Sequence, residues 1–354
     1  MKRALAFLFA CGLWAAASPT AQAQVSKVQA GFCARAISAG TAPFAIAIKM
    51  GWFQQDGAQV TVVPLAGSQA CVQNVASKAI DFALADVPSL AAARAQGLKA
   101  RIFYTGYQGN IFRIAVPAES SIQKISDLKG KTIGVISMGS GVLFAKAAVA
   151  SAGLDPEKDI RIVVAGEGAQ TAAMLRSKQV DALSQFDTQY AMVENAGMKL
   201  RLLDAGEIDH YPGSGFVALE ETLKTRRKEA AALARGYARG TIFAINNPEA
   251  AIRILYEVFP QAKPTGKDEA TAIKDDIKVL EARIVNWRLE YAGAKRWGES
   301  SEARCAQYLD FLLKWGVIHE KVSTQDVITN ELIPEINNFD AGKLAADAKA
   351  YRFQ

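Results

Sequence analysis

The sequence predicts an α/β protein of two lobes, each a mainly parallel sheet flanked by helices, with a cleft between the lobes. Apolar, strand-like runs alternate with helical patterns through the first two-thirds of the chain, and this alternation occurs in two successive groups. Beyond Glu220 the pattern is almost wholly helical. Alternating strands and helices favour a parallel sheet, and 354 residues exceed the length at which one core stops growing.

The first group of elements is expected to form part of lobe 1. Val72, Val75 and Ala76 recur at helical spacing and would lie on one face of a helix. In chain order we expect a strand at 32–37, a helix at 43–53, a strand at 60–64, a helix at 68–78, a strand at 81–85 and a helix at 87–96.

The second group repeats the pattern and is expected to form lobe 2. Its strands are expected at 132–136, 160–165 and 180–184, and its helices at 142–152, at 171–177 and from 188. Linkers between the lobes are expected near 111–116 and 212–219. The domain organisation is therefore a signal peptide at 1–23, the first part of lobe 1 at 24–112, lobe 2 at 113–211, and a return strand with C-terminal helices, mostly of lobe 1, at 212–354.

The N-terminus has the pattern of a cleavable secretory signal. Lys2 and Arg3 precede an apolar stretch from 4 to 17, which is shorter than the ~20 residues of a membrane span. Small residues follow, and we expect cleavage after Ala23 and a periplasmic location. Lipidation at Cys11 is the less favoured alternative, because Phe9 is bulky where a lipobox has a small residue.

Charge and cysteine content argue against several functions. The formal net charge is +6 with acids and bases interspersed, whereas a nucleic-acid partner requires a concentrated basic stripe. No CxxC or CxxH spacing occurs, so neither a zinc site nor another metal or cofactor is expected. Cys33 and Cys71 are the expected pair if a disulfide forms in an oxidising compartment. Buried reduced cysteines are the open alternative.

The junctions between each strand and the next helix carry the candidate binding residues. Ligands of open α/β sheets bind beyond the carboxyl ends of the strands. Most of the six junctions offer a hydroxyl beside a small residue at the first turn of a helix, where unpaired N–H groups attract anionic or polar groups. One such junction is more often an ordinary N-cap, but six in two lobes favour a shared cleft. The candidate ligand-binding residues are Ser38, Thr41, Gly67, Ser68, Gln69, Asp86, Ser89, Ser137, Gly139, Ser140, Gln185, Asp187 and Ser214.

The motifs of nucleotide binding and of catalysis are absent. Ser137–Gly141 follows a strand as a phosphate loop does, but Phe144 occupies the position of the third glycine of a dinucleotide fingerprint. Neither His210 nor His319 has a partner at metal or triad spacing, and no G-x-S-x-G motif occurs. For the carboxylates Asp86 and Asp187, acid–base work and binding of a ligand amine or hydroxyl both stay open.

Four segments resemble the periplasmic substrate-binding proteins of nitrate/taurine/alkanesulfonate-type ABC importers. The most specific is ISDLKGKTIGV at 125–135, similar to the D-L-K-G-K-x-I-G-V stretch that opens the second lobe of that family. The others are APFAIAIKMGWFQQDGAQV at 42–60, AGSQACVQNVASKAIDFALAD at 66–86 and LRSKQVDALSQFDTQYAMVENAG at 175–197. The resemblance spans about 32–255 and thins toward the C-terminus.

This resemblance implies the type II periplasmic-binding-protein fold, with two crossovers between lobes that close on a ligand like a hinged trap. It implies a receptor without catalytic activity that delivers a solute to an ABC permease and ATPase. We expect the receptor to be monomeric and its solute to be a small organic anion, such as a sulfonate or carboxylate. The family's contacts correspond to Ser38, Thr41, Ser68, Ser89, Ser137, Ser140, Gln185 and Ser214. The segment containing Arg283, Trp287 and Arg288 matches no family pattern.

Two other functions stay open. An enzyme on this scaffold would resemble a thiamine-pyrimidine synthase, but those proteins need a cysteine-rich segment and an active-site histidine that do not appear here. The other is a ligand-binding partner of a membrane sensor. As to the ligand, the helix starts suit an oxyanion, whereas aromatic residues close to the junctions suit a planar ring. These are Phe44, Tyr104, Tyr107 and Phe186. We expect an organic anion, and an aromatic one is compatible with the sequence.

Overall fold

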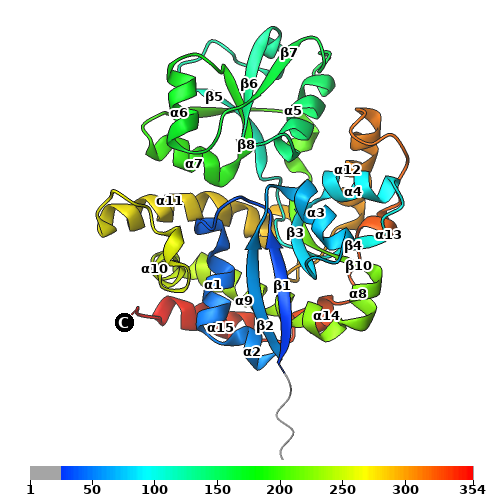
Figure 1. Cartoon of the computed structure of the whole chain (residues 1–354), viewed down its shortest axis with the longest axis vertical. Helices are drawn as coiled ribbons and strands as arrows, with labels where there is room; N and C mark the ends of the chain where they lie inside the picture. The colour runs from blue at the N-terminus through cyan, green and yellow to red at the C-terminus, as the bar shows by residue number, and fades with distance from the viewer. Residues whose placement is uncertain (1–24, 354) are drawn as a thin grey trace, which may run out of the picture.

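Two five-stranded sheets form the centres of two lobes (Figure 1). The computed structural model describes residues 25–353, so the expected signal peptide and Cys11 lie outside the described residues. The sheet of lobe 1 has the order β2 (Ala58–Pro64), β1 (Ser26–Phe32), β3 (Phe82–Asp86), β10 (Ser214–Leu219) and β4 (Ala100–Thr105). The sheet of lobe 2 has the order β7 (Ile160–Val164), β6 (Lys131–Val135), β8 (Ala182–Phe186), β5 (Phe112–Pro117) and β9 (Leu200–Leu203).

Each sheet is mainly parallel and contains one antiparallel strand. β10 is antiparallel to both of its neighbours in lobe 1, and β5 is antiparallel to both of its neighbours in lobe 2. These are the first strands after each crossover between the lobes. The chain enters each lobe from the cleft, at the carboxyl edge of the parallel strands, so its first strand runs in the opposite direction. The predicted two-lobed α/β fold is confirmed.

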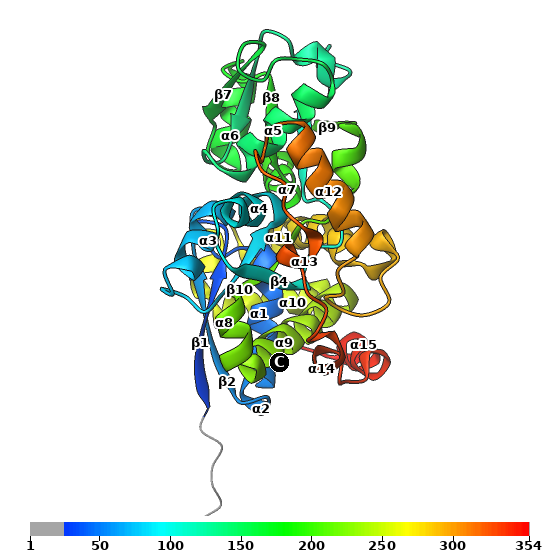
Figure 2. The same cartoon turned by 90° about the vertical axis from the view of Figure 1, so that its right-hand side faces the viewer.

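Helices cover both faces of each sheet and fill the C-terminal third of the chain (Figures 1 and 2). Those of the two α/β groups are α1 (Ala42–Lys49), α2 (Trp52–Gln55), α3 (Ser68–Ala76), α4 (Val87–Ala95), α5 (Ser140–Ser151), α6 (Ala169–Arg176) and α7 (Asp187–Asn195). The C-terminal helices are α8 (Glu220–Thr225), α9 (Arg227–Asn246), α10 (Pro248–Val258), α11 (Glu269–Trp287), α12 (Glu302–Lys314), α13 (Thr324–Val327), α14 (Ile333–Ile336) and α15 (Ala341–Ala350). Short 3-10 turns are η1 (Ala39–Thr41), η2 (Ile125–Leu128), η3 (Gly206–His210), η4 (Pro260–Ala262) and η5 (Leu289–Ala292).

The prediction was wrong for the first strand and for the linkers. β1 ends at Phe32, so residues 33–37 form a loop rather than the expected strand. The apolar side chains of this loop face the cleft instead of a sheet. The residues expected to be linkers belong almost entirely to β5 and β10. The crossovers are the shorter segments 106–111 and 204–213 between the two sheets.

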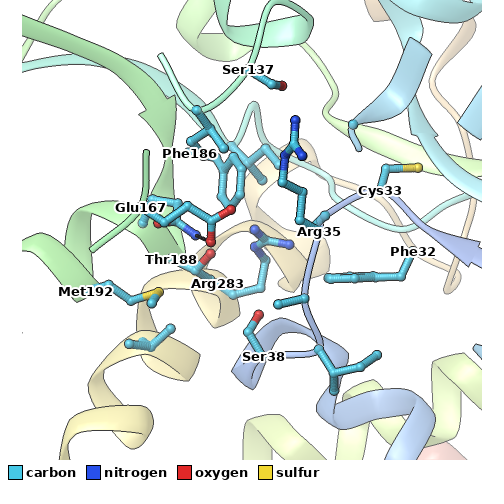
Figure 3. A pocket seen from close by; sticks show the side chains of 18 of the residues that line it. Phe32, Cys33, Arg35, Ser38, Ser137, Glu167, Phe186, Thr188, Met192 and Arg283 are labelled. Atoms are coloured by element: carbon cyan, nitrogen blue, oxygen red, sulfur yellow. Dashed lines mark hydrogen bonds between the residues drawn. The ribbon is translucent and has the colours of Figure 1, made fainter. Parts of the chain in front are cut away.

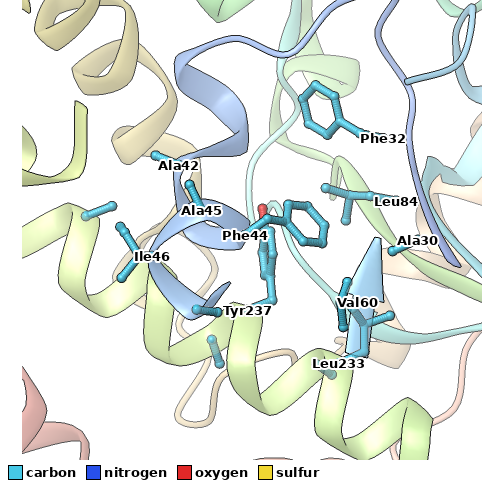
Figure 4. Close-up of a cluster of buried hydrophobic side chains, with 14 of the residues drawn as sticks. Ala30, Phe32, Ala42, Phe44, Ala45, Ile46, Val60, Leu84, Leu233 and Tyr237 are labelled. Carbon is cyan, nitrogen blue, oxygen red and sulfur yellow. The ribbon is translucent and has the colours of Figure 1, made fainter. Parts of the chain in front are cut away.

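Aromatic side chains join the sheet of lobe 1 to the helices below it (Figure 4). Phe44 of α1, Phe216 of β10 and Tyr237 of α9 are fully buried. The ring of Tyr237 lies 4.9 Å from that of Phe44 and 5.1 Å from that of Phe216, both edge-on, which is a favoured geometry for aromatic pairs. A Cβ at Gly240 would collide with the backbone of Pro43, so glycine permits the close approach of α9 to α1.

The C-terminal helices hold the two crossovers together. Gly213 donates its backbone N–H to the carbonyl of Tyr107, and the Asn110 side chain donates to the carbonyl of Ile208. From α12, Arg304 donates to backbone carbonyls of both crossovers, those of Gln108 and His210. Figure 2 shows α12 beside the junction of the lobes. The hinge is therefore built from segments on both sides of lobe 2 in the sequence.

Asn247 ties the last helix of the chain to the packed helices of lobe 1. Its side chain caps α10 by accepting from the N–H of Ala250, and it donates to the carbonyls of Ala348 and Tyr351. Replacing Asn247 by alanine is expected to lower the free energy of unfolding by about 1–2 kcal/mol, measured by urea denaturation. The neighbouring Asn246→Ala, whose amide donates only to Ile242 of the same helix, should cost about 0.5 kcal/mol or less. Equal losses of unfolding free energy in the two variants would show that the contacts of Asn247 with Ala348 and Tyr351 add no stability.

Candidate functional site

A cavity of about 410 Å³ lies between the two lobes. Lobe 1 contributes the loop 32–38 and the junctions before α3, and lobe 2 contributes the junctions before α5, α6 and α7. A further wall comes from the segment 261–265 and from α11, which belong to neither α/β group. Ligand cavities in proteins typically measure about 300–1,000 Å³, so this one has the size of a small organic molecule.

The lobes approach each other closely at the rim of the cavity. A Cβ placed on Gly67, at the start of α3 in lobe 1, would lie 3.8 Å from the Ser137 hydroxyl of lobe 2. Gly67 has a φ of +93°, a backbone conformation that glycine adopts without steric cost. The absence of a side chain at this position lets the two rims meet, so the structure represents a closed arrangement of the lobes.

A disulfide fixes the loop that lines the cavity from lobe 1. Cys33 follows β1 directly and is bonded to Cys71 of α3. The two residues are those that the sequence indicated as the expected pair. Cys33, Arg35 and Ile37 of this loop all line the cavity. The disulfide therefore restrains the part of lobe 1 that a bound molecule would contact.

Arg35 and Glu167 are charged side chains that line the cavity from opposite lobes. Arg35 is exposed, has no ion pair among residues 25–353 and points toward Ser137 of lobe 2 (Figure 3). Glu167 is half-buried and accepts a hydrogen bond of 3.3 Å from the Gln189 amide. An uncompensated guanidinium attracts carboxylates, sulfonates and similar oxyanions.

Arg283 of α11 lies on the opposite wall and is paired with Asp187 of lobe 2. The Arg283 side chain is only 3% exposed, and its Nε donates to both Asp187 carboxylate oxygens at 2.9 and 2.8 Å. Burial lowers the pKa of the guanidinium, but the adjacent carboxylate outweighs this effect and holds the pKa above its ordinary value. The pair therefore joins the two lobes as a buried, ionised contact.

Apolar and aromatic side chains make up much of the remaining wall. Phe112 and Phe186 meet edge to face with ring centroids 5.8 Å apart. The other apolar lining residues come from both lobes and include Phe32, Ile37, Leu84, Tyr107, Ile111, Ile136 and Met192. Such a lining favours a ligand with a flat or apolar body.

The structure brings six of the thirteen predicted binding residues to the cavity. Those that line it are Ser38, Gly67, Ser68, Ser137, Ser140 and Ser214. The others, which lie outside the lining, are Thr41, Gln69, Asp86, Ser89, Gly139, Gln185 and Asp187.

Most of the residues outside the lining use their polar groups within the protein. The Thr41 hydroxyl donates to the carbonyl of Ser38, and Asp86 caps α4 by accepting from the N–H of Ser89. The Gln185 amide donates to the carbonyl of Gly166. Gln69 is exposed. These are the local capping and turn contacts that hydroxyl, carboxylate and amide side chains commonly make.

Two arginines of the cavity were missed as binding residues in the sequence. Arg35 lay in the segment taken for a strand, and Arg283 lay in a C-terminal segment without a family pattern. A signal for Arg35 existed, because it follows the first strand at the position where sites of open sheets form. No local signal could have placed Arg283, since its position depends on how α11 returns to the cleft.

Two α/β lobes joined by two crossovers and enclosing a ligand-sized cavity define the periplasmic-binding-protein fold. Residues 38–251 match the family model described as NMT1/THI5 like. The match covers more than half of the chain, which therefore belongs to the NMT1/THI5-like family. Both crossovers and all of lobe 2 lie within the matched region, whereas α11 and α12 lie beyond it.

Similar proteins include binding proteins for several small molecules. The riboflavin-binding protein RibY of Chloroflexus aurantiacus is 24% identical over 298 residues, which cover 83% of this chain and 82% of the relative. The alkanesulfonate-binding protein SsuA of Xanthomonas axonopodis bound to MOPS has a TM-score of 0.63 at 16% identity, covering 86% of this chain and 98% of that chain. The nitrate-binding protein NrtA of Synechocystis PCC 6803 has a TM-score of 0.65 at 17% identity, covering 92% and 91%. At these identities the solved structures show the shared fold.

Neither histidine of the chain lines the cavity, and its one lining cysteine, Cys33, is in a disulfide. Within residues 25–353, no three His, Cys, Asp or Glu side chains are grouped so that they could hold a metal ion. In the same range, no helix is both long and apolar enough to cross a membrane.

Proposed function

We propose that this protein is an extracytoplasmic solute-binding receptor. It captures a small organic anion between its lobes and presents it to the permease and ATPase of an ABC importer. The observation that carries this proposal is the closed cavity, whose wall is shared between two lobes that are linked only by crossovers and the C-terminal helices. A receptor of this type needs a cavity that exists only when the lobes are closed, because an importer can then distinguish the closed, ligand-bound receptor from the open one.

The size and lining of the cavity favour an anion with an aromatic or heterocyclic body. An ion as small as nitrate would leave most of the 410 Å³ unfilled, and the aromatic wall would gain no contact from it. Riboflavin, named for one relative, and MOPS, an organic sulfonate bound in another, are both larger than nitrate and carry rings. Arg35 and the hydroxyls of Ser137 and Ser140 would receive the charged group of such a ligand.

The alternative of an enzyme on this scaffold has less support. The cavity wall lacks a histidine, and Cys33 is held as a disulfide rather than as a thiolate nucleophile. Binding by preformed hydrogen-bond donors requires neither group. We therefore propose a receptor rather than a catalyst, periplasmic and monomeric, in agreement with the sequence.

Thermal denaturation with a panel of probes tests the proposal. The panel contains benzoate, benzenesulfonate, MOPS, riboflavin and nitrate. The concentration of each probe is varied from well below to well above its dissociation constant. A ring-bearing carboxylate or sulfonate is expected to raise Tm, because a ligand at 100 times its Kd stabilises the native state by about 2.7 kcal/mol. Nitrate should produce a smaller shift. Absence of a shift with every ring-bearing probe would contradict the proposal, and turnover of a probe would favour the enzyme.

A further inference from the structure

We propose that Arg283 binds an oxygen atom of the ligand and that Asp187 is the residue that positions Arg283. This inference rests on the proposed function and specifies the chemistry of the ligand. It places a specificity-determining residue outside the region 38–251 that the family model covers.

The carboxylate oxygens of Asp187 accept hydrogen bonds from groups of the protein itself. Besides the two bonds from Nε, Nη2 of Arg283 donates to Oδ1 at 2.6 Å, and the Asn286 amide donates to Oδ2 at 2.8 Å. The backbone N–H of Thr188 adds a further bond to Oδ1 at 2.7 Å. Four N–H donors surround the carboxylate, one of them shared between its two oxygens, so Asp187 holds the guanidinium in place and has little capacity left for a ligand.

The remaining nitrogen of Arg283 is free to donate. The hydrogen bonds of Arg283 to Asp187 use Nε and Nη2 and leave Nη1 unused, and the side chain lines the cavity beside Tyr107. Figure 3 shows the guanidinium facing the space enclosed by Ser38, Phe32 and Arg35. A donor that faces the cavity without a protein acceptor can form a hydrogen bond with an acceptor on the ligand.

The guanidinium is also fixed by aromatic rings. Its central carbon lies 4.3 Å from the ring centroid of Tyr107 and 5.9 Å from that of Phe186. Both distances are in the range of favourable cation–π contacts. A donor that is already immobilised loses little side-chain entropy on binding, so Nη1 is preorganised.

This geometry defines the group that the ligand must carry. Asp187 offsets the charge of Arg283, so Nη1 acts mainly as a directional donor and accepts a carbonyl, carboxylate or sulfonate oxygen. The guanidinium lies near the rings of Tyr107 and Phe186, so we expect this oxygen to be attached to the planar body of the ligand. Arg35, which forms no ion pair among the described residues, supplies an attraction for negative charge.

Isothermal titration calorimetry on Arg283→Lys tests the inference. The probe is whichever of benzoate, benzenesulfonate, MOPS and riboflavin stabilises the wild-type protein most. Lysine retains a positive charge beside Asp187 but lacks the planar fork that leaves Nη1 free. We expect an affinity loss of about 10- to 100-fold, the effect of losing a hydrogen bond to a charged group.

Arg94→Lys is the matched control. Arg94 is also largely buried, at 9% exposure, and donates to two carboxylates, those of Glu220 and Asp326, but it does not line the cavity. An affinity loss for Arg283→Lys no larger than that for Arg94→Lys would overturn the inference. A wild-type protein that binds no probe would instead overturn the proposed function, and this inference with it.

A crystal structure of the wild-type protein with the same probe tests the inference even if Arg283→Lys does not fold. A probe oxygen within about 3.2 Å of Nη1 is expected. A carbon atom, a water molecule or an empty space at that position would show that Arg283 serves only to join the lobes.

Discussion

Replacing Ser140 by tryptophan is expected to abolish binding of ring-bearing anions, with at least a 100-fold rise in Kd. Ser140 is the first residue of α5 and lines the cavity while half-buried. An indole at this position would occupy part of the 410 Å³ and would cover the N–H groups at the start of the helix. Ser140 lines the cavity and is not part of the buried core, so the fold should remain intact. Calorimetry measures the affinity, and circular dichroism and Tm measure the fold.

Ser151→Trp is the control for this substitution. Ser151 is the last residue of the same helix, is also half-buried and lies outside the cavity lining. It should bind the probe with nearly the wild-type affinity. If Ser140→Trp also retained the wild-type affinity, Ser140 would have no place in the binding site, and the assignment of this cavity would be contradicted.

Removal of the Cys33–Cys71 disulfide is expected to lower the free energy of unfolding by about 4 kcal/mol. The bridge closes a loop with a sequence separation of 38 residues, and the chain-entropy model gives this magnitude for a loop of that size. The double variant Cys33→Ala/Cys71→Ala should also bind the probe more weakly, because the loop that carries Arg35 loses its restraint. Urea denaturation and calorimetry measure the two effects.

Cys305→Ala provides the comparison, since Cys305 is the buried free cysteine of residues 25–353. Removing its sulfur should cost about 1 kcal/mol, and the remaining difference belongs to the bridge. Incubation of the wild-type protein with dithiothreitol should reproduce the double variant. Stability that does not change under full reduction would show that the bridge contributes nothing.

The alternation of apolar runs predicted most strands of both sheets and most of their helices, but it missed β4, β5 and β9. Each predicted strand after the first lies within two residues of the observed one, because a buried parallel strand reads as a short apolar run between turn residues. The first strand was misplaced because Ala36 and Ile37 continue the apolar pattern into the loop. Local apolarity cannot distinguish a side chain that faces a sheet from one that faces a ligand cavity.

The site was only partly predictable for a related reason. The rule that sites form after strands correctly located Ser137 and Ser140 at the cavity. It could not separate hydroxyls that face the cleft from those that cap their own helices, as the side chain of Asp86 does for α4. The contribution of α11 depends on contacts over long sequence separations. Arg283 and Asp187 are 96 residues apart, and neither local sequence indicates that the two side chains are in contact.

The position of β10 has a consequence for the order in which the protein assembles. All strands of the lobe 2 sheet lie between Phe112 and Leu203 in one continuous segment. The lobe 1 sheet lacks a strand between β3 and β4 until Ser214–Leu219 has been added. As the chain is synthesised from its N-terminus, the second lobe can complete its sheet while the first still lacks a strand. A chaperone that binds the emerging chain would therefore encounter lobe 1 with an incomplete sheet next to lobe 2 with a complete one.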